Sequence, residues 1–348
     1  MSKKDMSFDT KLIHAGEPDP RIEGAVSVPI FQSSTFEYAG QTDYDSLRYI
    51  RLNNTPNHIA LHKKLAALEG AEAALVTSSG MSAITTALLT YLQSGDHLLA
   101  QSTLYGGTAD YVKHDLPQYG IEVDFFDAMI PDDWESKVKS NTKVVYVETI
   151  TNPLMSVPEL GAIIELGKKH KLISMIDNTF ASPALYCPIM QGFDISLHSA
   201  TKYLNGHTDI VAGVVIGSEN NISKVRSKLN HLGGSLDPNA CFLLHRGIKT
   251  LSLRMNRQCQ NAMAIARFLE SHPKVKQVNY PGLESNPSHN RAKEYLCGFS
   301  AMISFELTGD VSAADAFIGR LEYPICTASL GGVESLVTRP VQTSHSLL

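Results

Sequence analysis

The sequence has no long apolar run, and this absence argues against one class of protein. No stretch approaches the roughly 20 apolar residues that a membrane-spanning helix needs. The first ten residues, M-S-K-K-D-M-S-F-D-T, have no apolar run behind their lysines, so we expect no signal peptide. We therefore expect a cytoplasmic protein that does not associate with membranes.

Clusters of basic residues are missing as well. The net charge is -5 and no Lys/Arg stripe offsets it, so the surface does not favour nucleic acid or anionic lipid. The five cysteines are scattered without a C-x-x-C pair, which predicts reduced thiols rather than a disulfide framework. The sequence also lacks internal repeats and low-complexity segments. These absences, with a hydrophobic content of 43 %, are typical of a globular enzyme.

What the sequence does have is a lysine between two short apolar runs. Residues 194–217, D-I-S-L-H-S-A-T-K-Y-L-N-G-H-T-D-I-V-A-G-V-V-I-G, place Ser199, Thr201 and Lys202 between two β-branched stretches of strand length. Desolvation there would lower the lysine pKa, and a neutral amine can form a Schiff base. The two hydroxyls could donate to a phosphate. A lysine at a strand end that points to water is the alternative interpretation.

A second apolar stretch ends in a carboxylate. Residues 172–180 read L-I-S-M-I-D-N-T-F, a predicted strand that ends in Asp177. Ligands of open α/β sheets bind at the carboxyl ends of the strands. Pyridoxal phosphate needs a lysine for covalent attachment and a carboxylate that keeps its ring nitrogen protonated. Asp177 and Lys202 supply that pair, each beside its own strand.

Six motifs extend this pattern along the chain: S-S-G-M, L-Y-G-G-T, E-T-x-T-N-P, D-N-T-F, S-A-T-K-Y-L-N-G-H and S-L-G-G-x-E-S-L. With them, the sequence from about Ile13 to its last residue resembles the Cys/Met-metabolism (trans-sulfuration) family of pyridoxal-phosphate enzymes. This family includes cystathionine γ-lyase, γ-synthase and β-lyase, methionine γ-lyase and the O-acylhomoserine sulfhydrylases. The resemblance implies pyridoxal 5'-phosphate as the cofactor and an amino acid as the small-molecule substrate.

The predicted fold is α/β. Strand-like runs alternate with runs at helical spacing, such as 160–167 and 222–229, which predicts a mostly parallel central sheet with helices on both faces. The resemblance adds the name of this fold, PLP-dependent transferase fold type I (aspartate-aminotransferase-like), with a smaller C-terminal α+β domain. We expect an N-terminal arm (1–55), a large cofactor-binding domain (56–242) and a small C-terminal domain (243–348). One long helix over 243–266 is expected to join the two domains.

One pair of histidines has the spacing of a helical metal site. His58 and His62 stand at i and i+4 of a predicted helix over 58–68, but position 59 is not the glutamate of an H-E-x-x-H motif. No third ligand is evident. We therefore interpret the pair as part of a solvated helix face and expect no metal.

The resemblance assigns further residues to the site. Gly80 and Met81 follow a predicted strand and open a helix, where free N–H groups favour a phosphate. By resemblance, Tyr105 stacks on the cofactor ring and acts in proton transfer, while Asn152 contacts the ring hydroxyl and the substrate carboxylate. Ser329 lies on a loop (326–334) that is expected to return to the substrate.

The N-terminal arm is expected to serve another subunit. By resemblance, Tyr49 and Arg51 reach the phosphate of the adjacent subunit's cofactor, and the guanidinium fork suits that contact. A monomer would then have incomplete sites. The resemblance therefore implies a homo-oligomer, a dimer at minimum and commonly a tetramer.

Three departures from the family pattern bear on the reaction. Arg48 and Ala328 stand where cystathionine-specific members carry acidic residues for the distal ammonium, so Arg48 either binds a distal carboxylate or points to solvent. Gly107 stands where methionine γ-lyases carry a cysteine. The family continues past T-S-H-S to an arginine that grips the substrate carboxylate, and Arg339 does not match that motif. Either the sequence stops before this arginine or the chain is truncated.

The leading prediction is a carbon–sulfur lyase that performs γ-elimination on cystathionine, methionine or a homocysteine-type substrate. A γ-replacement synthase, of the cystathionine γ-synthase or O-acylhomoserine sulfhydrylase type, is the first alternative, and cystathionine β-lyase is the second. A catalytically impaired cofactor-binding protein is a further alternative from another class.

Overall fold

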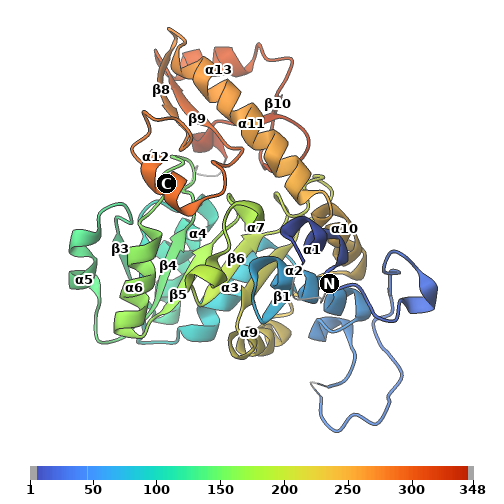
Figure 1. The fold of residues 1–348 in the computed structure, drawn as a ribbon. Helices are drawn as coiled ribbons and strands as arrows, with labels where there is room; N and C mark the ends of the chain where they lie inside the picture. Colours follow the sequence, from blue (N-terminus) through green and yellow to red (C-terminus); the bar gives the residue numbers. More distant parts are fainter. Residues whose placement is uncertain (1–5, 45, 344–348) are drawn as a thin grey trace. The chain divides into compact units, whose positions relative to one another are not determined.

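A computed structural model describes residues 6–44 and 46–343 (Figure 1). The chain divides into two compact units, and each unit combines two separate segments. Unit 1 consists of Met1–Tyr91 and Cys187–Ser252, and unit 2 consists of Leu92–Tyr186 and Leu253–Leu348. The domain boundaries given above follow a different division of the chain, and they remain a prediction.

The described part of unit 1 contains three strands, with β7 (Gly213–Gly217) between β1 (Ala73–Thr77) and β6 (Ile195–Ser199). Because β7 is antiparallel to both neighbours, β1 and β6 run in the same direction. Thr77 and Ser199, at their carboxyl ends, both pair with Gly213. The loops that follow β1 and β6 therefore leave the strands at the same edge, on either side of Gly213.

The helices of unit 1 precede, connect and follow these strands: α1 (Phe8–His14), α2 (Pro56–Glu69), α3 (Gly80–Tyr91), α8 (Pro188–Gln191), α9 (Glu219–Leu232) and α10 (Pro238–Ile248). Two 3₁₀ turns, Ile22–Gly24 and Ile50–Leu52, interrupt a long loop between α1 and α2. Lys64 of α2 is fully buried and donates to the carbonyls of Leu12 (2.9 Å) and Ile13 (3.2 Å). The start of the predicted arm is thus fixed to its own chain.

Unit 2 contains four parallel strands in the order β5-β4-β2-β3. Their bounds are β2 (His97–Gln101), β3 (Glu122–Phe126), β4 (Thr142–Glu148) and β5 (Ile173–Asp177). The interior of β4 is entirely apolar and buried from Val144 to Val147, as is typical of a parallel strand covered on both faces. Glu148 and Asp177, the last residues of β4 and β5, are register partners.

The helices before residue 187 in unit 2 are α4 (Gly106–Asp110), α5 (Trp134–Lys137), α6 (Leu160–His170) and α7 (Ser182–Leu185). A π-helical turn (Tyr111–Asp115) and two 3₁₀ turns (Leu116–Tyr119 and Pro131–Asp133) complete this segment. The later segment contains α11 (Leu251–Glu270), α12 (His289–Tyr295) and α13 (Val311–Ile318), with a 3₁₀ turn at Pro340–Gln342. Its strands form two pairs. The strands β8 (Val275–Asn279) and β9 (Ser304–Leu307) are antiparallel, and β10 (Ile325–Cys326) and β11 (Leu336–Val337) are parallel.

The single long helix predicted over 243–266 is wrong. The structure has two helices, and α10 ends at Ile248 before α11 begins at Leu251. At the break, the backbone N–H and the hydroxyl of Thr250 both donate to the Gly247 carbonyl, at 3.2 and 3.1 Å. The tighter i−3 bond takes the place of the i−4 bond that would continue the helix.

The solvated helix face predicted for His58 and His62 is also wrong. His58 is 0 % exposed and lies within 2.8 Å of the Leu236 carbonyl, while His62 Nε2 accepts from the backbone N–H of Val76 at 3.0 Å. The helix α2 is buried on several sides, so the spacing of its apolar residues does not indicate which side faces solvent. Among the described residues, no group of three or more His, Cys, Asp or Glu side chains could hold a metal ion.

The buried His58 makes stability depend on pH. Burial lowers its pKa from 6.5 to about 4. Between these values the unfolded chain binds a proton that the folded chain does not, so folding stability falls as the pH drops from 6.5 to 4. The loss is about 3 kcal/mol by linkage. Urea unfolding at pH 7 and pH 4.5 should show a smaller loss for His58→Gln than for the wild type, and equal losses would contradict the assignment.

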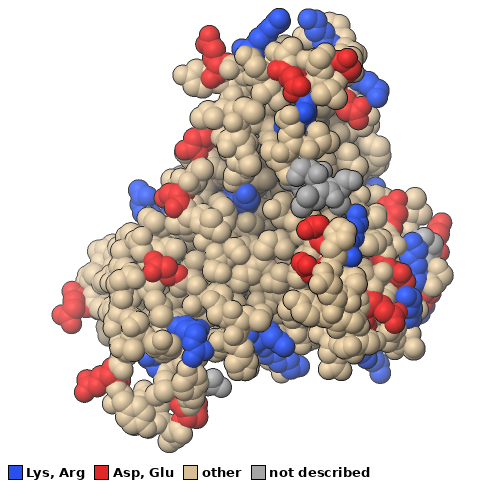
Figure 2. Space-filling view, turned by 180° about the vertical axis from the view of Figure 1, so that it is seen from behind, with Lys and Arg blue, Asp and Glu red and all other residues tan. Residues whose placement is uncertain are grey.

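Three further features concern membrane-spanning helices, cysteines and surface charge. Within the described residues, no helix is long and apolar enough to cross a membrane. All five cysteines are free thiols. On the face in Figure 2, basic and acidic side chains are interspersed among uncharged ones.

Candidate active site

In unit 1, the start of α3 presents unbonded backbone N–H groups of the kind that bind an anion. The helix begins at Gly80, three residues after β1 ends. Ser79 caps it, because its hydroxyl accepts from the Ser82 N–H at 3.0 Å and its carbonyl accepts from Ala83. The N–H groups of Gly80 and Met81 have no i−4 carbonyl within the helix, so they can donate to a phosphate.

Two glycines allow this helix start to lie against the loop after β6. A Cβ at Gly80 would lie 2.7 Å from Ser199 Cβ, so only a bare backbone fits beside that serine. A Cβ at Gly213 would lie 2.0 Å from the Ser79 carbonyl oxygen. The Ser79–Gly80 backbone therefore approaches Ser199 over a position in β7 that carries no side chain. The predicted phosphate donors at Gly80 and Ser199 are together in the structure.

We expect Gly213→Ala to distort this arrangement. The new methyl group would overlap the Ser79 carbonyl, and overpacking of this kind costs roughly 1–3 kcal/mol. The midpoint of thermal unfolding should fall, and pyridoxal phosphate should bind more weakly in an absorbance titration. Gly161→Ala in α6 is the matched control, since its Cβ would meet only the Tyr295 hydroxyl at 3.5 Å. If both variants bind the cofactor like the wild type, the close approach is not needed for binding.

Lys202 lies in a tight turn directly after β6. Its backbone N–H donates to the Ser199 carbonyl at 3.1 Å, and its own carbonyl accepts from Gly206 at 2.8 Å. The Thr201 hydroxyl accepts from the Ala212 N–H at 3.0 Å and donates to the Ala212 carbonyl at 3.2 Å, which ties the turn to the residue before β7. Burial lowers the pKa of Lys202 below its usual value. The structure thus favours a desolvated amine over the alternative of a lysine that points to water.

In unit 2, Asp177 is held at the carboxyl end of β5. Its Oδ1 accepts from the backbone N–H of Thr179 at 3.0 Å and from the Thr179 hydroxyl at 2.5 Å. These two donors fix the carboxyl group and stabilise its charged form. Asp177 is therefore a positioned carboxylate at the edge where ligands of α/β sheets bind.

Glu148 is a residue to which the sequence assigned no role. It ends β4 and is only 4 % exposed. One oxygen accepts from the Tyr105 N–H at 2.6 Å, and the other accepts from the Asn152 N–H at 3.3 Å. The structure therefore joins Tyr105 and Asn152, two predicted site residues, through one carboxyl group. The signal available in the sequence was a glutamate at the end of the otherwise apolar run V-V-Y-V-E.

The predicted residues of the N-terminal arm make contacts of their own in unit 1. In unit 1, the Arg51 guanidinium donates to the Asn230 carbonyl at 2.8 Å and to the Tyr44 hydroxyl, and it lies 5.6 Å above the Tyr49 ring. Arg48 lies 5.6 Å above the Phe36 ring. Each arginine thus makes a cation–π contact within the arm, and Arg51 is also bonded to α9 (Glu219–Leu232).

Ser329 has an unusual backbone. Its φ of 93° is in the region that favours glycine, in unit 2. The adjacent loop is fixed by Gln258, whose amide donates to the Gly332 carbonyl at 2.7 Å. Non-glycine residues in such conformations cluster at functional sites. The strain is consistent with the predicted contact between Ser329 and substrate.

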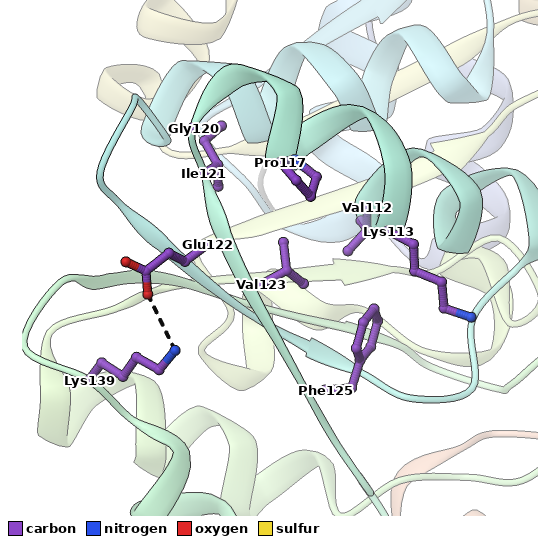
Figure 3. A pocket seen from close by; sticks show the side chains of 9 residues that line it. All are labelled: Val112, Lys113, Pro117, Gly120, Ile121, Glu122, Val123, Phe125 and Lys139. Carbon is purple, nitrogen blue, oxygen red and sulfur yellow. Dashed lines mark hydrogen bonds and ion pairs between the residues drawn. The ribbon is translucent and has the colours of Figure 1, made fainter.

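A separate open hollow lies along the edge strand β3 (Figure 3). It encloses about 530 Å³, and none of the predicted site residues lines it. Lys139 pairs with Glu122 at 3.3 Å and Asp124 at 2.9 Å. Charged side chains of this kind protect an edge strand from pairing with another chain. We therefore assign this hollow no part in the site.

Each unit, taken by itself, carries residues of a kind that pyridoxal phosphate requires. Unit 1 offers N–H and hydroxyl donors for a phosphate, beside a desolvated lysine for an aldehyde. Unit 2 offers a fixed carboxylate for a protonated ring nitrogen. Each of these groups of residues matches one part of the chemistry that the cofactor requires of a protein.

Comparison with known proteins gives the same class and then the family. The sequence pattern of the Cys/Met metabolism PLP-dependent enzymes matches residues 9–348. The chain therefore belongs to this family of pyridoxal-phosphate-dependent enzymes, and the α/β fold with a mostly parallel central sheet is confirmed.

Relatives in the family catalyse more than one reaction. The chain is 39 % identical to an L-methionine gamma-lyase of Porphyromonas gingivalis over 99 % of its own length and 90 % of the relative's. It is 42 % identical to a cystathionine beta-lyase of Lactococcus lactis, with 98 % and 89 % covered. The chain is thus a lyase or synthase of trans-sulfuration, and the relatives do not select one activity.

The similar solved structures also include both a lyase and a synthase. A cystathionine gamma-lyase from Lactobacillus plantarum, complexed with L-serine, superposes with a TM-score of 0.93 at 37 % identity, with 99 % of this chain and 89 % of that chain covered. A cystathionine gamma synthase from Xanthomonas oryzae pv. oryzae, in complex with aminoacrylate and cysteine, gives 0.94 at 36 % identity, with the same coverage. Elimination and replacement enzymes thus share this fold.

Proposed function

We propose that this enzyme is a carbon–sulfur lyase that performs γ-elimination on cystathionine, methionine or a homocysteine-type substrate. The observation that carries the proposal is the turn after β6, where Lys202 bonds through its backbone N–H to Ser199 and Ser199 lies against Gly80. The departures at Arg48, Gly107 and Ala328 weaken cystathionine and methionine as substrates, so the choice among the reactions of the family rests on the assay below.

We assign the cofactor contacts as follows. The N–H groups of Gly80 and Met81 and the hydroxyls of Ser199 and Thr201 bind the phosphate. Lys202 would hold the cofactor covalently through its amine, and the Asp177 carboxylate would keep the ring nitrogen protonated. Tyr105 offers a flat ring face, and Asn152 an amide for the ring hydroxyl and the substrate carboxylate.

Bound pyridoxal phosphate supplies an aldehyde that couples to amines and a ring that withdraws electrons from the substrate's α-carbon. Lys202 takes the α-proton, because burial increases the fraction of its amine that is neutral near pH 7. Asp177 keeps its negative charge and so keeps the ring nitrogen protonated. Tyr105 is placed to assist proton transfer, and Ser329 contacts the substrate.

A γ-replacement synthase is the second candidate, and Arg48 favours it. A guanidinium at a position where an acidic residue would bind a distal ammonium suits a distal carboxylate, as in O-succinylhomoserine. Cystathionine β-lyase and a cofactor-binding protein without turnover are the remaining alternatives.

One experiment separates these reactions. The purified protein with added pyridoxal phosphate is mixed with L-cystathionine and then with L-methionine, and the keto acid is identified. We expect 2-oxobutyrate, which identifies γ-elimination. Pyruvate from cystathionine would identify a β-lyase. Turnover only with an O-acylhomoserine and a thiol would identify a synthase, and no turnover with any substrate would favour the cofactor-binding protein.

We further propose a cytoplasmic homo-oligomer in which Tyr49 and Arg51 serve the phosphate of a neighbouring subunit. The aromatic and basic side chains clustered in the arm support this proposal. Gel filtration combined with activity assays at increasing dilution tests it. Active monomers would contradict the shared site.

A further inference from the structure

Glu148 is the buried acidic group at the carboxyl edge of the sheet in unit 2 that the proposed mechanism does not use. It lies at the end of β4 as the register partner of Asp177. Burial and the negative charge of Asp177 raise the pKa of Glu148 well above its usual value, while the N–H donors of Tyr105 and Asn152 oppose that shift. Burying an acid at this position is costly, so a specific role would explain its presence.

The contacts of Glu148 show what it connects. Oε1 accepts from the Tyr105 N–H at 2.6 Å, and Oε2 accepts from the Asn152 N–H at 3.3 Å. Tyr105 precedes α4, whereas Asn152 lies in the loop that follows β4. Tyr105 is 43 residues and Asn152 is 4 residues from Glu148 in the sequence, so one carboxyl group fixes two separate loops.

Glu148 is itself fixed from β2. The side-chain oxygen of Gln101 accepts from the Glu148 backbone N–H at 3.2 Å, and the Gln101 amide donates to the Thr103 carbonyl at 2.5 Å. The loop from Thr103 to Tyr105 is therefore held at two points. The Tyr105 side chain remains 38 % exposed although its backbone is fixed. A fixed backbone with an accessible ring is what a stacking residue needs.

We infer that Glu148 is a positioning residue that sets the Tyr105 ring and the Asn152 amide for the cofactor and the substrate. The inference rests on the proposed roles of Tyr105 and Asn152. Both carboxyl oxygens are needed, because each accepts from a different loop. Glutamine has the same length but only one accepting oxygen, and its NH₂ group cannot accept from an N–H.

The test measures cofactor binding to the cofactor-free protein by absorbance titration, which requires no turnover. Loss of one of the two accepting oxygens of the buried carboxyl group predicts that Glu148→Gln weakens pyridoxal phosphate binding about tenfold. Glu148→Asp keeps both accepting oxygens on a shorter chain and should recover part of this affinity. The KM for the amino-acid substrate should rise in the Gln variant, since the Asn152 loop is released.

His97→Gln is the matched control for a purely structural effect. His97 is also buried and hydrogen-bonded, to the Thr142 hydroxyl at 2.7 Å, but it lies at the opposite, amino-terminal ends of the strands. The His97→Gln substitution should lower the thermal unfolding midpoint without changing the affinity for the cofactor. Equal cofactor affinity in the wild type and Glu148→Gln, or equal losses in the Gln variants of Glu148 and His97, would overturn the inference.

The binding titration also separates this inference from the proposed function. A wild-type protein that binds pyridoxal phosphate but eliminates no thiol would contradict the proposed lyase and leave the Glu148 comparison intact. If Glu148→Gln does not fold, Glu148→Asp alone decides the question. An Asp variant with wild-type affinity and wild-type KM would then overturn the positioning role.

Discussion

Replacement of Lys202 by alanine is expected to lower kcat/KM for keto acid formation by at least about 10³-fold, because both the covalent link and the α-proton acceptor are lost. The absorption band of the covalently bound cofactor should disappear at the same time. The assay follows the keto acid with the substrate that the wild type prefers.

Lys63→Ala is the matched control for Lys202. Lys63 lies on α2 of the same unit, and its side chain is exposed. Its replacement should leave turnover and the cofactor spectrum unchanged. Full turnover by the Lys202 variant would end the proposed mechanism.

Asp177→Asn has the second largest expected effect. Asparagine keeps the shape of the side chain but carries no negative charge, so the ring nitrogen loses the group that keeps it protonated. We expect kcat to fall by roughly 10²-fold or more, with a smaller change in KM, since the charge acts mainly after the substrate has bound. Steady-state kinetics at pH 7 measure both constants.

Asp127→Asn is the control for Asp177. Asp127 Oδ1 accepts from the N–H two residues later, at Met129, in the same way that Asp177 accepts from Thr179. Asp127 is exposed, so its change tests loss of the local turn alone. Equal kinetics for the two variants would show that the charge at Asp177 does no chemistry.

The sequence by itself determined the pieces of the site that depend on local pattern. Asp177 ends one short apolar strand, Lys202 follows another, and the strand–turn–helix pattern around Gly80 is visible in consecutive residues. Turn chemistry and strand periodicity act over a few residues. The α/β fold and the family follow from the same motifs.

Only the tertiary structure decided how these pieces are supported. Gly213 is an ordinary strand glycine in the sequence, and only its pairing with both Thr77 and Ser199 shows why a side chain there would collide with the Ser79 carbonyl. Glu148 acquires its role through contact with Tyr105, 43 residues away along the chain.

The same reason explains the predictions that were wrong. His58 is buried because its α2 helix is covered on several sides, and the helix over 243–266 is broken where Thr250 bonds back to Gly247. Burial and hydrogen-bond competition depend on what packs around a segment rather than on its own residues. Local pattern therefore determined which groups do the chemistry, and long-range packing decided which residues hold them in place.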